Sequence, residues 1–159
     1  MLSLPPLIEE DIQCMENALD DLLQRSESLG ALLIDKGGPL ITQRGKLAGF
    51  DTTTMSALAA GSFAATEAIA GLVGESNFSS IYQQGEHHSV LVGNVGENLL
   101  LIVIFKASLS VGVVKYYAAN TVQVVAAQLE QARARTPDSS LDLVSLNMTD
   151  TSELFKKKA

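Results

Sequence analysis

The feature that most constrains the fold is a run of seven apolar residues, Leu99 to Phe105, with no polar side chain at any position. A strand with one face in water alternates apolar and polar residues, whereas a strand covered on both faces is apolar throughout. Seven residues are too few to cross a bilayer as a helix, which needs about 20. The run therefore predicts a central strand in a sheet that carries helices on both faces.

Short apolar runs and turn residues predict four further strands. The residues Asp35-Lys36-Gly37-Gly38 are a strong turn signal, because glycine accepts positive φ angles, so the flanking segments are predicted to pair as a hairpin. A second glycine-rich turn, 93–96, is expected before the central strand. The five predicted strands are 29–34, 39–44, 78–85, 88–92 and 98–105.

Three stretches with helical periodicity predict helices. The first begins near Pro5 and Pro6, since proline is tolerated in a first helical turn. The second is capped by Asp51 and ends near Val73, and the third spans about 110–135. The core stripe of the first is Ile8, Ile12, Met15, Leu19 and Leu22, and that of the third is Val111, Val114, Ala118, Val122, Val125, Leu129 and Ala132.

The predicted order is α-β-β-α-β-β-β-α, an α+β domain with a five-stranded antiparallel sheet and helices on both faces. We assign residues 1–136 to this domain. Residues 137–159 are expected to form a linker and a short partner-binding helix, in which an acidic start precedes Leu154, Phe155 and three lysines. The plain alternative for that segment is a frayed chain end.

The second predicted helix carries two apolar stripes. A stripe of small residues lies about 110° around the helix from the stripe expected to pack in the core. Small side chains let another backbone approach closely, so this stripe packs either on the protein's own sheet or on a sister subunit or partner. The second interpretation is favoured, because the core stripe already supplies the sheet contact. Phe63 falls on neither stripe and would anchor a contact if it were exposed. The expected core stripe is Met55, Leu58, Ser62, Ala65, Ile69 and Leu72, and the small-residue stripe is Ala57, Gly61, Ala64, Ala68 and Gly71.

The composition narrows the class of partner. A net charge of −7 and a pI near 4.7 argue against nucleic acid, which binds clustered lysine and arginine. Only 18% of residues are charged and the mean hydropathy is +0.21, so another chain is expected to cover some apolar surface. Cys14 is the only cysteine, and neither a signal peptide nor a membrane span is predicted, so the expected location is the cytoplasm.

No set of residues indicates an active site of the chain's own. His87 and His88 are adjacent, so on a strand they would point to opposite faces and could not share a metal ion. No GxxxxGK[ST] phosphate-binding motif is present. We therefore expect no catalytic residue, metal or cofactor. Arg44 alone lies in a loop-like setting from which an arginine finger could reach a GTPase, and ordinary surface charge is the stronger interpretation.

The order and spacing of five segments resemble the roadblock-domain family, and within it the bacterial MglB group. The resemblance covers Leu29 to Arg135, and the second-helix block is its most specific part. The segments are LIDKGGPLI, FDTTTMSALAAGSFAATEAIAGLVGE, FSSIYQQGE, LLLIVIF and SVGVVK.

This resemblance implies a function. Roadblock proteins homodimerise through the second helix and third strand, and MglB-like proteins bind a Ras-like small GTPase of the MglA type through the second-helix surface. They stimulate GTP hydrolysis without an arginine finger, in bacterial polarity or motility, and a C-terminal segment promotes nucleotide exchange. This chain departs from the family by ending in three lysines and an alanine. The partner-binding residues implied by position are Ala57, Ala60, Gly61, Ala64, Ala68, Leu154 and Phe155.

Two other functions stay open at this point. A roadblock scaffold would bind a GTPase without any effect on GTP hydrolysis. A ligand-sensing α/β domain would hold a small molecule in a pocket between sheet and helix, although the convergent polar residues of such a pocket are not visible in the sequence.

Overall fold

The apolar run forms the middle of the sheet, as predicted. In the computed structural model, which describes residues 3–135, β5 (Leu99–Lys106) is the central strand of a five-stranded antiparallel sheet with the order β2-β1-β5-β4-β3. Every residue from Leu99 to Phe105 is buried. The other strands are β1 (Gly30–Asp35), β2 (Leu40–Gly45), β3 (Ser80–Gln84) and β4 (His88–Val95), and the helices are α1 (Glu9–Ser26), α2 (Thr52–Leu72) and α3 (Val111–Arg135).

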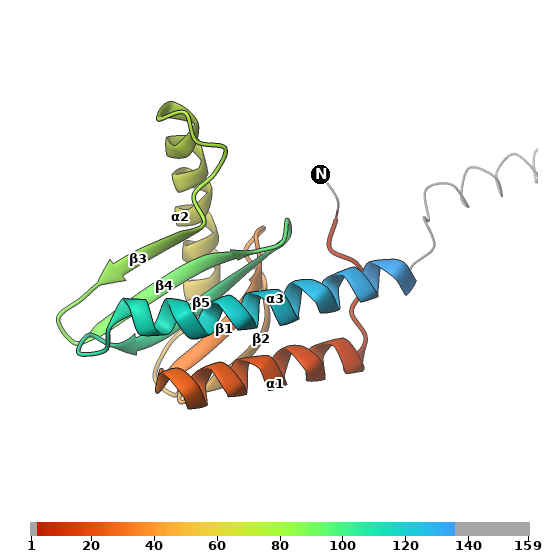
Figure 1. The fold of residues 1–159 in the computed structure, drawn as a ribbon, viewed down its shortest axis with the longest axis horizontal. Helices are drawn as coiled ribbons and strands as arrows, with labels where there is room; N and C mark the ends of the chain where they lie inside the picture. The colour runs from red at the N-terminus through yellow and green to blue at the C-terminus, as the bar shows by residue number, and fades with distance from the viewer. Residues whose placement is uncertain (1–2, 136–159) are drawn as a thin grey trace, which may run out of the picture.

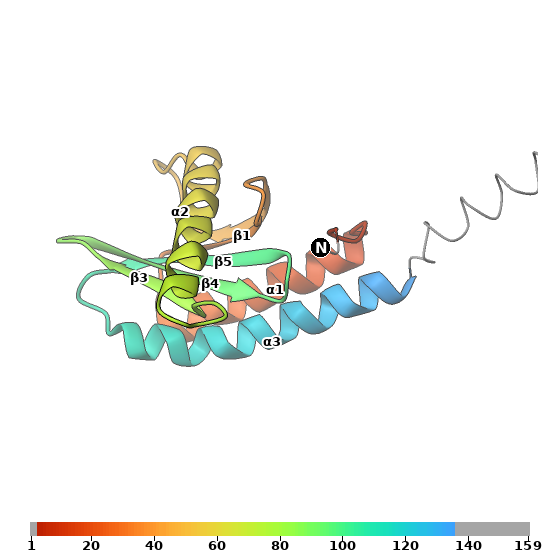
Figure 2. The same cartoon turned by 90° about the horizontal axis from the view of Figure 1, so that it is seen from above.

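Helices cover both faces of the sheet, which confirms the predicted α+β roadblock-type architecture. Helices α1 and α3 run side by side over one face, and α2 crosses the other face steeply (Figures 1 and 2). One buried cluster therefore lies between the sheet and the α1–α3 layer, and a second lies under α2. In Figure 1 the C-terminal end of α2 projects beyond the strands.

Two predicted boundaries were wrong. Helix α1 begins at Glu9 and not at Pro5, because a residue that precedes proline disfavours helical angles and the Asp11 carboxylate caps the later start by accepting the Ile8 N–H at 2.8 Å. The turn expected at 93–96 is also shorter. Residues Gly93 and Asn94 lie inside β4 and pair with β5, because ladder hydrogen bonds to neighbours on both sides outweigh their turn preference.

Helix α2 has the predicted bounds but turns a different face to the sheet. Asp51 caps it by accepting the Thr54 N–H at 3.1 Å. Phe63, expected to be partly exposed, is only 1% exposed and fills the cluster beneath the helix. Of the expected core stripe, Met55 is half-buried against this cluster, and the residues from Leu58 onward are exposed. The buried residues of α2 are Ser56, Ala60, Phe63 and Ala70.

A buried carboxylate joins α1 to α3. Asp11 is fully buried, and its Oδ1 accepts hydrogen bonds from Gln128 Nε2, at 2.7 Å, and from Arg135 Nη2. The hydrogen bond from Arg135 is the main reason why the pKa of Asp11 falls from its ordinary 3.8 to about 2, although burial alone would raise it. This contact fixes the C-terminal end of α3 against the N-terminal end of α1.

Replacing Asp11 with asparagine is expected to lower the free energy of unfolding by about 1–3 kcal/mol, because Gln128 and Arg135 lose a buried, charged hydrogen-bond acceptor. Since the folded pKa lies below the ordinary one, this stabilisation is present above pH 3.8 and is lost as the pH falls through 2. Urea unfolding at neutral pH and at about pH 3 measures the free energy of unfolding of the variant and of wild type. The difference between these two free energies should be smaller at about pH 3. Asp21→Asn, which removes an exposed pair with Arg25, is the control. Equal stability of the two variants would contradict the role of Asp11.

Candidate functional site

Helix α2 leaves most of its surface uncovered in the subunit. Counted at 100° per residue, the buried face, the small-residue stripe and the stripe of larger apolar residues lie roughly 100° to 145° apart around the helix. The first of these packs against the sheet, and Met55, at the N-terminal end of the larger stripe, is half-buried against the same cluster. Because Glu67 is the only charged residue in α2, the two outward faces are almost entirely uncharged.

The small-residue stripe is open to solvent, but Ala60, which the family resemblance adds to the implied partner-binding residues, is not. Ala57, Gly61, Ala64 and Ala68 are exposed, whereas Ala60 is 6% exposed and packs in the cluster under the helix. A Cβ placed on Gly61 would meet no atom within 4 Å, and the same holds for one placed on Gly71. Glycine inside a helix costs about 1 kcal/mol relative to alanine, and no contact within the described subunit accounts for it here.

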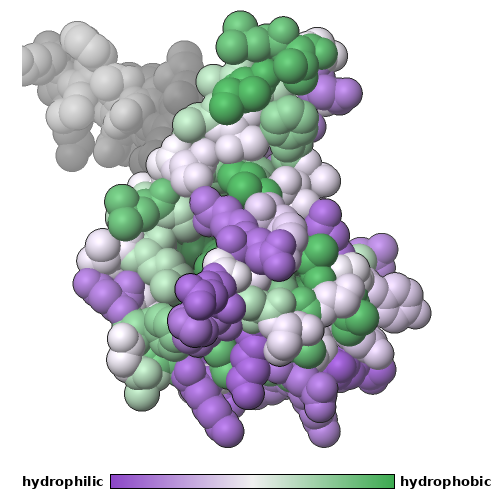
Figure 3. Space-filling model, turned by 90° about the vertical axis from the view of Figure 1, so that its left-hand side faces the viewer, coloured by the Kyte–Doolittle hydropathy of each residue, from purple (hydrophilic) through white to green (hydrophobic). Residues whose placement is uncertain are grey.

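The stripe of larger residues is also exposed. Leu58 is 68% exposed, Ile69 52% and Leu72 86%. Figure 3 shows hydrophobic side chains gathered on the projecting end of the molecule, where α2 ends. Exposed apolar side chains are normal singly, but a contiguous group of them indicates an interaction surface.

A groove, here called the β3 groove, runs beside this stripe. It has a volume of about 400 Å³ and lies between α2 and the β3–β4 side of the sheet. Within residues 3–135, strand β3 pairs only with β4, so its outer edge presents backbone groups that no other described strand pairs with. The apolar residues that line the groove are Met55, Leu58, Ala59, Ile81, Val90, Val92 and Ile102.

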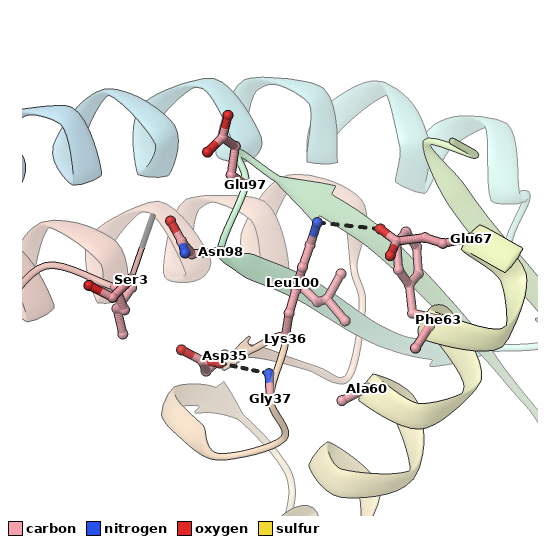
Figure 4. Close-up of a pocket in the computed structure, with 12 residues that line it drawn as sticks. Ser3, Asp35, Lys36, Gly37, Ala60, Phe63, Glu67, Glu97, Asn98 and Leu100 are labelled. Atoms are coloured by element: carbon pink, nitrogen blue, oxygen red, sulfur yellow. Dashed lines mark hydrogen bonds and ion pairs between the residues drawn. The ribbon is translucent and has the colours of Figure 1, made fainter. Parts of the chain in front are cut away.

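A second hollow, here called the turn cleft, lies on the opposite side of α2. It has a volume of about 580 Å³ and is bounded by α2, the β1–β2 turn, the β4–β5 turn and the chain before α1 (Figure 4). The Lys36 ammonium lies 3.5 Å from a Glu67 carboxylate oxygen, and Asp35 accepts the Gly37 N–H at 2.6 Å. Its apolar lining residues are Leu4, Ala60, Phe63, Ala64 and Leu100.

The sequence of residues 15–105 matches the family model described as the Roadblock/LC7 domain. That match spans more than half of the chain. The chain belongs to the Roadblock/LC7 family. A comparison with curated proteins found no match.

Solved structures of MglB resemble this roadblock domain over nearly their whole length. Myxococcus xanthus MglB is 28% identical with a TM-score of 0.75, and the match covers 80% of this chain and 96% of that one. The gliding protein MglB from Thermus thermophilus is also 28% identical with a TM-score of 0.75, and the match covers 82% of this chain and 99% of that one. An MglB with a tetrameric arrangement is 27% identical with a TM-score of 0.77, covering 83% and 99%.

All four arginines make contacts within the subunit. Arg44, the predicted finger candidate, makes two hydrogen bonds of 2.9 Å to the Asp20 carboxylate, so it is held against α1 and not in a loop. Arg25, Arg133 and Arg135 contact Asp21, Asn98 and Asp11, respectively.

The two histidines occupy the β3–β4 hairpin. Both are exposed, and His88 packs edge-on against Phe50 with ring centroids 5.7 Å apart. Among residues 3–135, no group of three or more His, Cys, Asp or Glu side chains could hold a metal ion.

By length and composition, α2 is apolar enough to cross a membrane, with a hydropathy of 1.3 over its most apolar window. Its buried residues pack on the sheet of the roadblock domain, so we interpret α2 as a helix of the folded domain. The predicted partner-binding residues Leu154 and Phe155 lie outside the described residues.

Proposed function

We propose that this chain is a homodimeric regulator of a Ras-like small GTPase of the MglA type, and that it accelerates GTP hydrolysis without an active site of its own. The observation that carries the proposal is the uncovered α2 surface on a domain that resembles MglB structures over 96–99% of their length. We place this function in the cytoplasm, in bacterial polarity or motility. Residues 1–136 are proposed as the roadblock domain and 137–159 as a separate partner-binding segment.

The larger apolar stripe and the β3 groove are proposed to meet the sister subunit. Two β3 edges can pair to continue the sheet, and a sister α2 placed over the groove would cover Leu58 and its neighbours. This arrangement would remove exposed apolar side chains of α2 from water.

The small-residue stripe is then left for the GTPase. Its residues are uncharged and short, which lets a partner backbone approach closely, and a Cβ added to Gly61 or Gly71 would meet no atom of residues 3–135 within 4 Å. Because every arginine is engaged within the chain, the acceleration is proposed to come from rearranging the GTPase's own catalytic residues.

Replacing Ala64 with arginine is expected to prevent complex formation with the GTPase while the domain stays folded, because a long charged side chain would enter a close contact. Ala127→Arg makes the same change at an exposed alanine of α3 and should leave binding intact. Sedimentation of each variant with the GTPase bound to a non-hydrolysable GTP analogue measures this. Unchanged binding by the Ala64 variant would contradict the placement of the interface.

The wild-type result of that experiment tests the proposed function itself. A complex with the GTP-bound form is expected. Absence of any complex would contradict the GTPase assignment, and a complex that leaves the hydrolysis rate unchanged would support the alternative, a roadblock scaffold.

A further inference from the structure

The turn cleft combines an apolar floor with an acidic rim. Phe63, Ala60 and Leu100 lie at its base, and Figure 4 shows charged side chains around them. Three carboxylates line the cleft, together with the Lys36 ammonium, which lies 3.5 Å from Glu67. The Arg133 guanidinium also reaches the rim at Ser3 and Asn98, so among the described residues the carboxylates outnumber the cations by one. The carboxylates belong to Asp35, Glu67 and Glu97. This chemistry suits a segment that carries apolar side chains followed by positive charge.

One segment of this chain has that chemistry. Residues 154–158 read Leu-Phe-Lys-Lys-Lys, an apolar pair followed by three cations. The aromatic ring and the leucine match the apolar floor in kind, and the lysines are opposite in sign to the rim. Elsewhere the charged residues of the chain are mostly acidic, so this cluster of cations is distinctive.

The last turn of α3 is linked by a side chain to the rim of the cleft. Arg133, two residues before the end of α3, donates hydrogen bonds to the Ser3 carbonyl, at 3.3 Å, and to Asn98 Oδ1. Ser3 and Asn98 both line the turn cleft. Residues 136–153 separate the end of α3 from Leu154, and such a length can span about 60 Å when extended. The segment therefore has ample reach to return to the cleft.

We propose that the C-terminal segment docks in the turn cleft of its own chain, with Leu154 and Phe155 on the apolar floor and the lysines facing Glu67 and Glu97. The docking does not depend on the proposed GTPase function. If that function holds, docking has a consequence, because Ala64 lines the same cleft and belongs to the small-residue stripe. A docked segment would then compete with the GTPase for this side of α2.

Fluorescence of the full chain tests the docking without any GTPase. The chain contains no tryptophan, so Phe155→Trp introduces a single one. With Cys14→Ser removing the only cysteine, Ser3→Cys allows a bimane label at the cleft rim. Docking predicts a blue-shifted tryptophan emission and quenching of the bimane by Trp at 155. An emission like that of the free peptide, together with unquenched bimane, would overturn the proposal.

Charge reversal adds a matched control. The double variant Glu67→Lys, Glu97→Lys should abolish the quenching. Adding Lys156→Glu and Lys158→Glu to that double variant should restore the quenching. Glu10→Lys with Glu27→Lys changes the net charge equally at exposed positions outside the cleft and should leave the quenching unchanged. Equal effects of the two acidic pairs would contradict a specific contact.

Quenching must also survive dilution of labelled chains with excess unlabelled wild type. Loss on dilution would show docking between subunits and overturn the assignment to the same chain.

Discussion

Replacing Phe63 with alanine is expected to lower the free energy of unfolding by about 3–5 kcal/mol. Phe63 is the largest side chain that α2 buries, and it is 1% exposed among the apolar residues of β1 and β5. The other buried residues of α2 are alanine and serine, so no neighbour on the helix could fill the cavity left by the ring. The second core cluster would lose its main contact with α2.

Chemical denaturation at a fixed protein concentration measures this effect, since subunit association also contributes to stability. Tyr116→Ala removes an aromatic ring that is 76% exposed on α3 and should change stability by no more than about 0.5 kcal/mol. If the two variants were equally stable, the face of α2 that contacts the sheet would have been wrongly assigned.

Replacing Ile69 with aspartate is expected to weaken the homodimer by about 2–4 kcal/mol, or about 30- to 700-fold in Kd. Ile69 is 52% exposed on the stripe proposed to meet the sister subunit. Placing a carboxylate there would bury a charge without a partner in the dimer, whereas in the separated subunit it would remain in water.

Sedimentation equilibrium over a range of protein concentrations distinguishes monomer from dimer. Val113→Asp is the matched control, because Val113 is 45% exposed but lies on α3, behind the opposite face of the sheet. The Ile69 variant should dissociate at concentrations where wild type and the control stay dimeric. A dimer unaffected by Ile69→Asp would place the subunit interface elsewhere.

The architecture could be predicted because single segments specify it. The uninterrupted run from Leu99 to Phe105 requires cover on both faces, and turn residues such as Gly37 and Gly38 separate the strands. Asp51 identifies the start of α2 because its carboxylate can satisfy a free N–H there. These signals are local, and the structure confirms each of them.

The face that α2 turns to the sheet could not be predicted from periodicity. An amphipathic helix reveals its core face by contrast with a polar face, but α2 has almost no polar face. The stripe with Leu58, Ile69 and Leu72 has the larger side chains, so periodicity predicts it as the core face. The subunit instead buries Phe63 with small residues around it, because these let the helix approach the sheet closely.

The contacts at the ends of α1 and α3 were also beyond the reach of sequence patterns. Asp11 and Arg135 are 124 residues apart, and no local motif links them. In the sequence Asp11 looks like an ordinary acidic residue of a first helical turn. Its burial and its pairing with α3 follow only from the way the two helices pack side by side.

The most direct test of the central claim is single-turnover GTP hydrolysis by an MglA-type GTPase, with and without an excess of this protein. The proposed function predicts a large acceleration, which Arg44→Ala should retain because Arg44 is held by Asp20 and supplies no finger. An unchanged hydrolysis rate despite complex formation would contradict the claim and leave a scaffold.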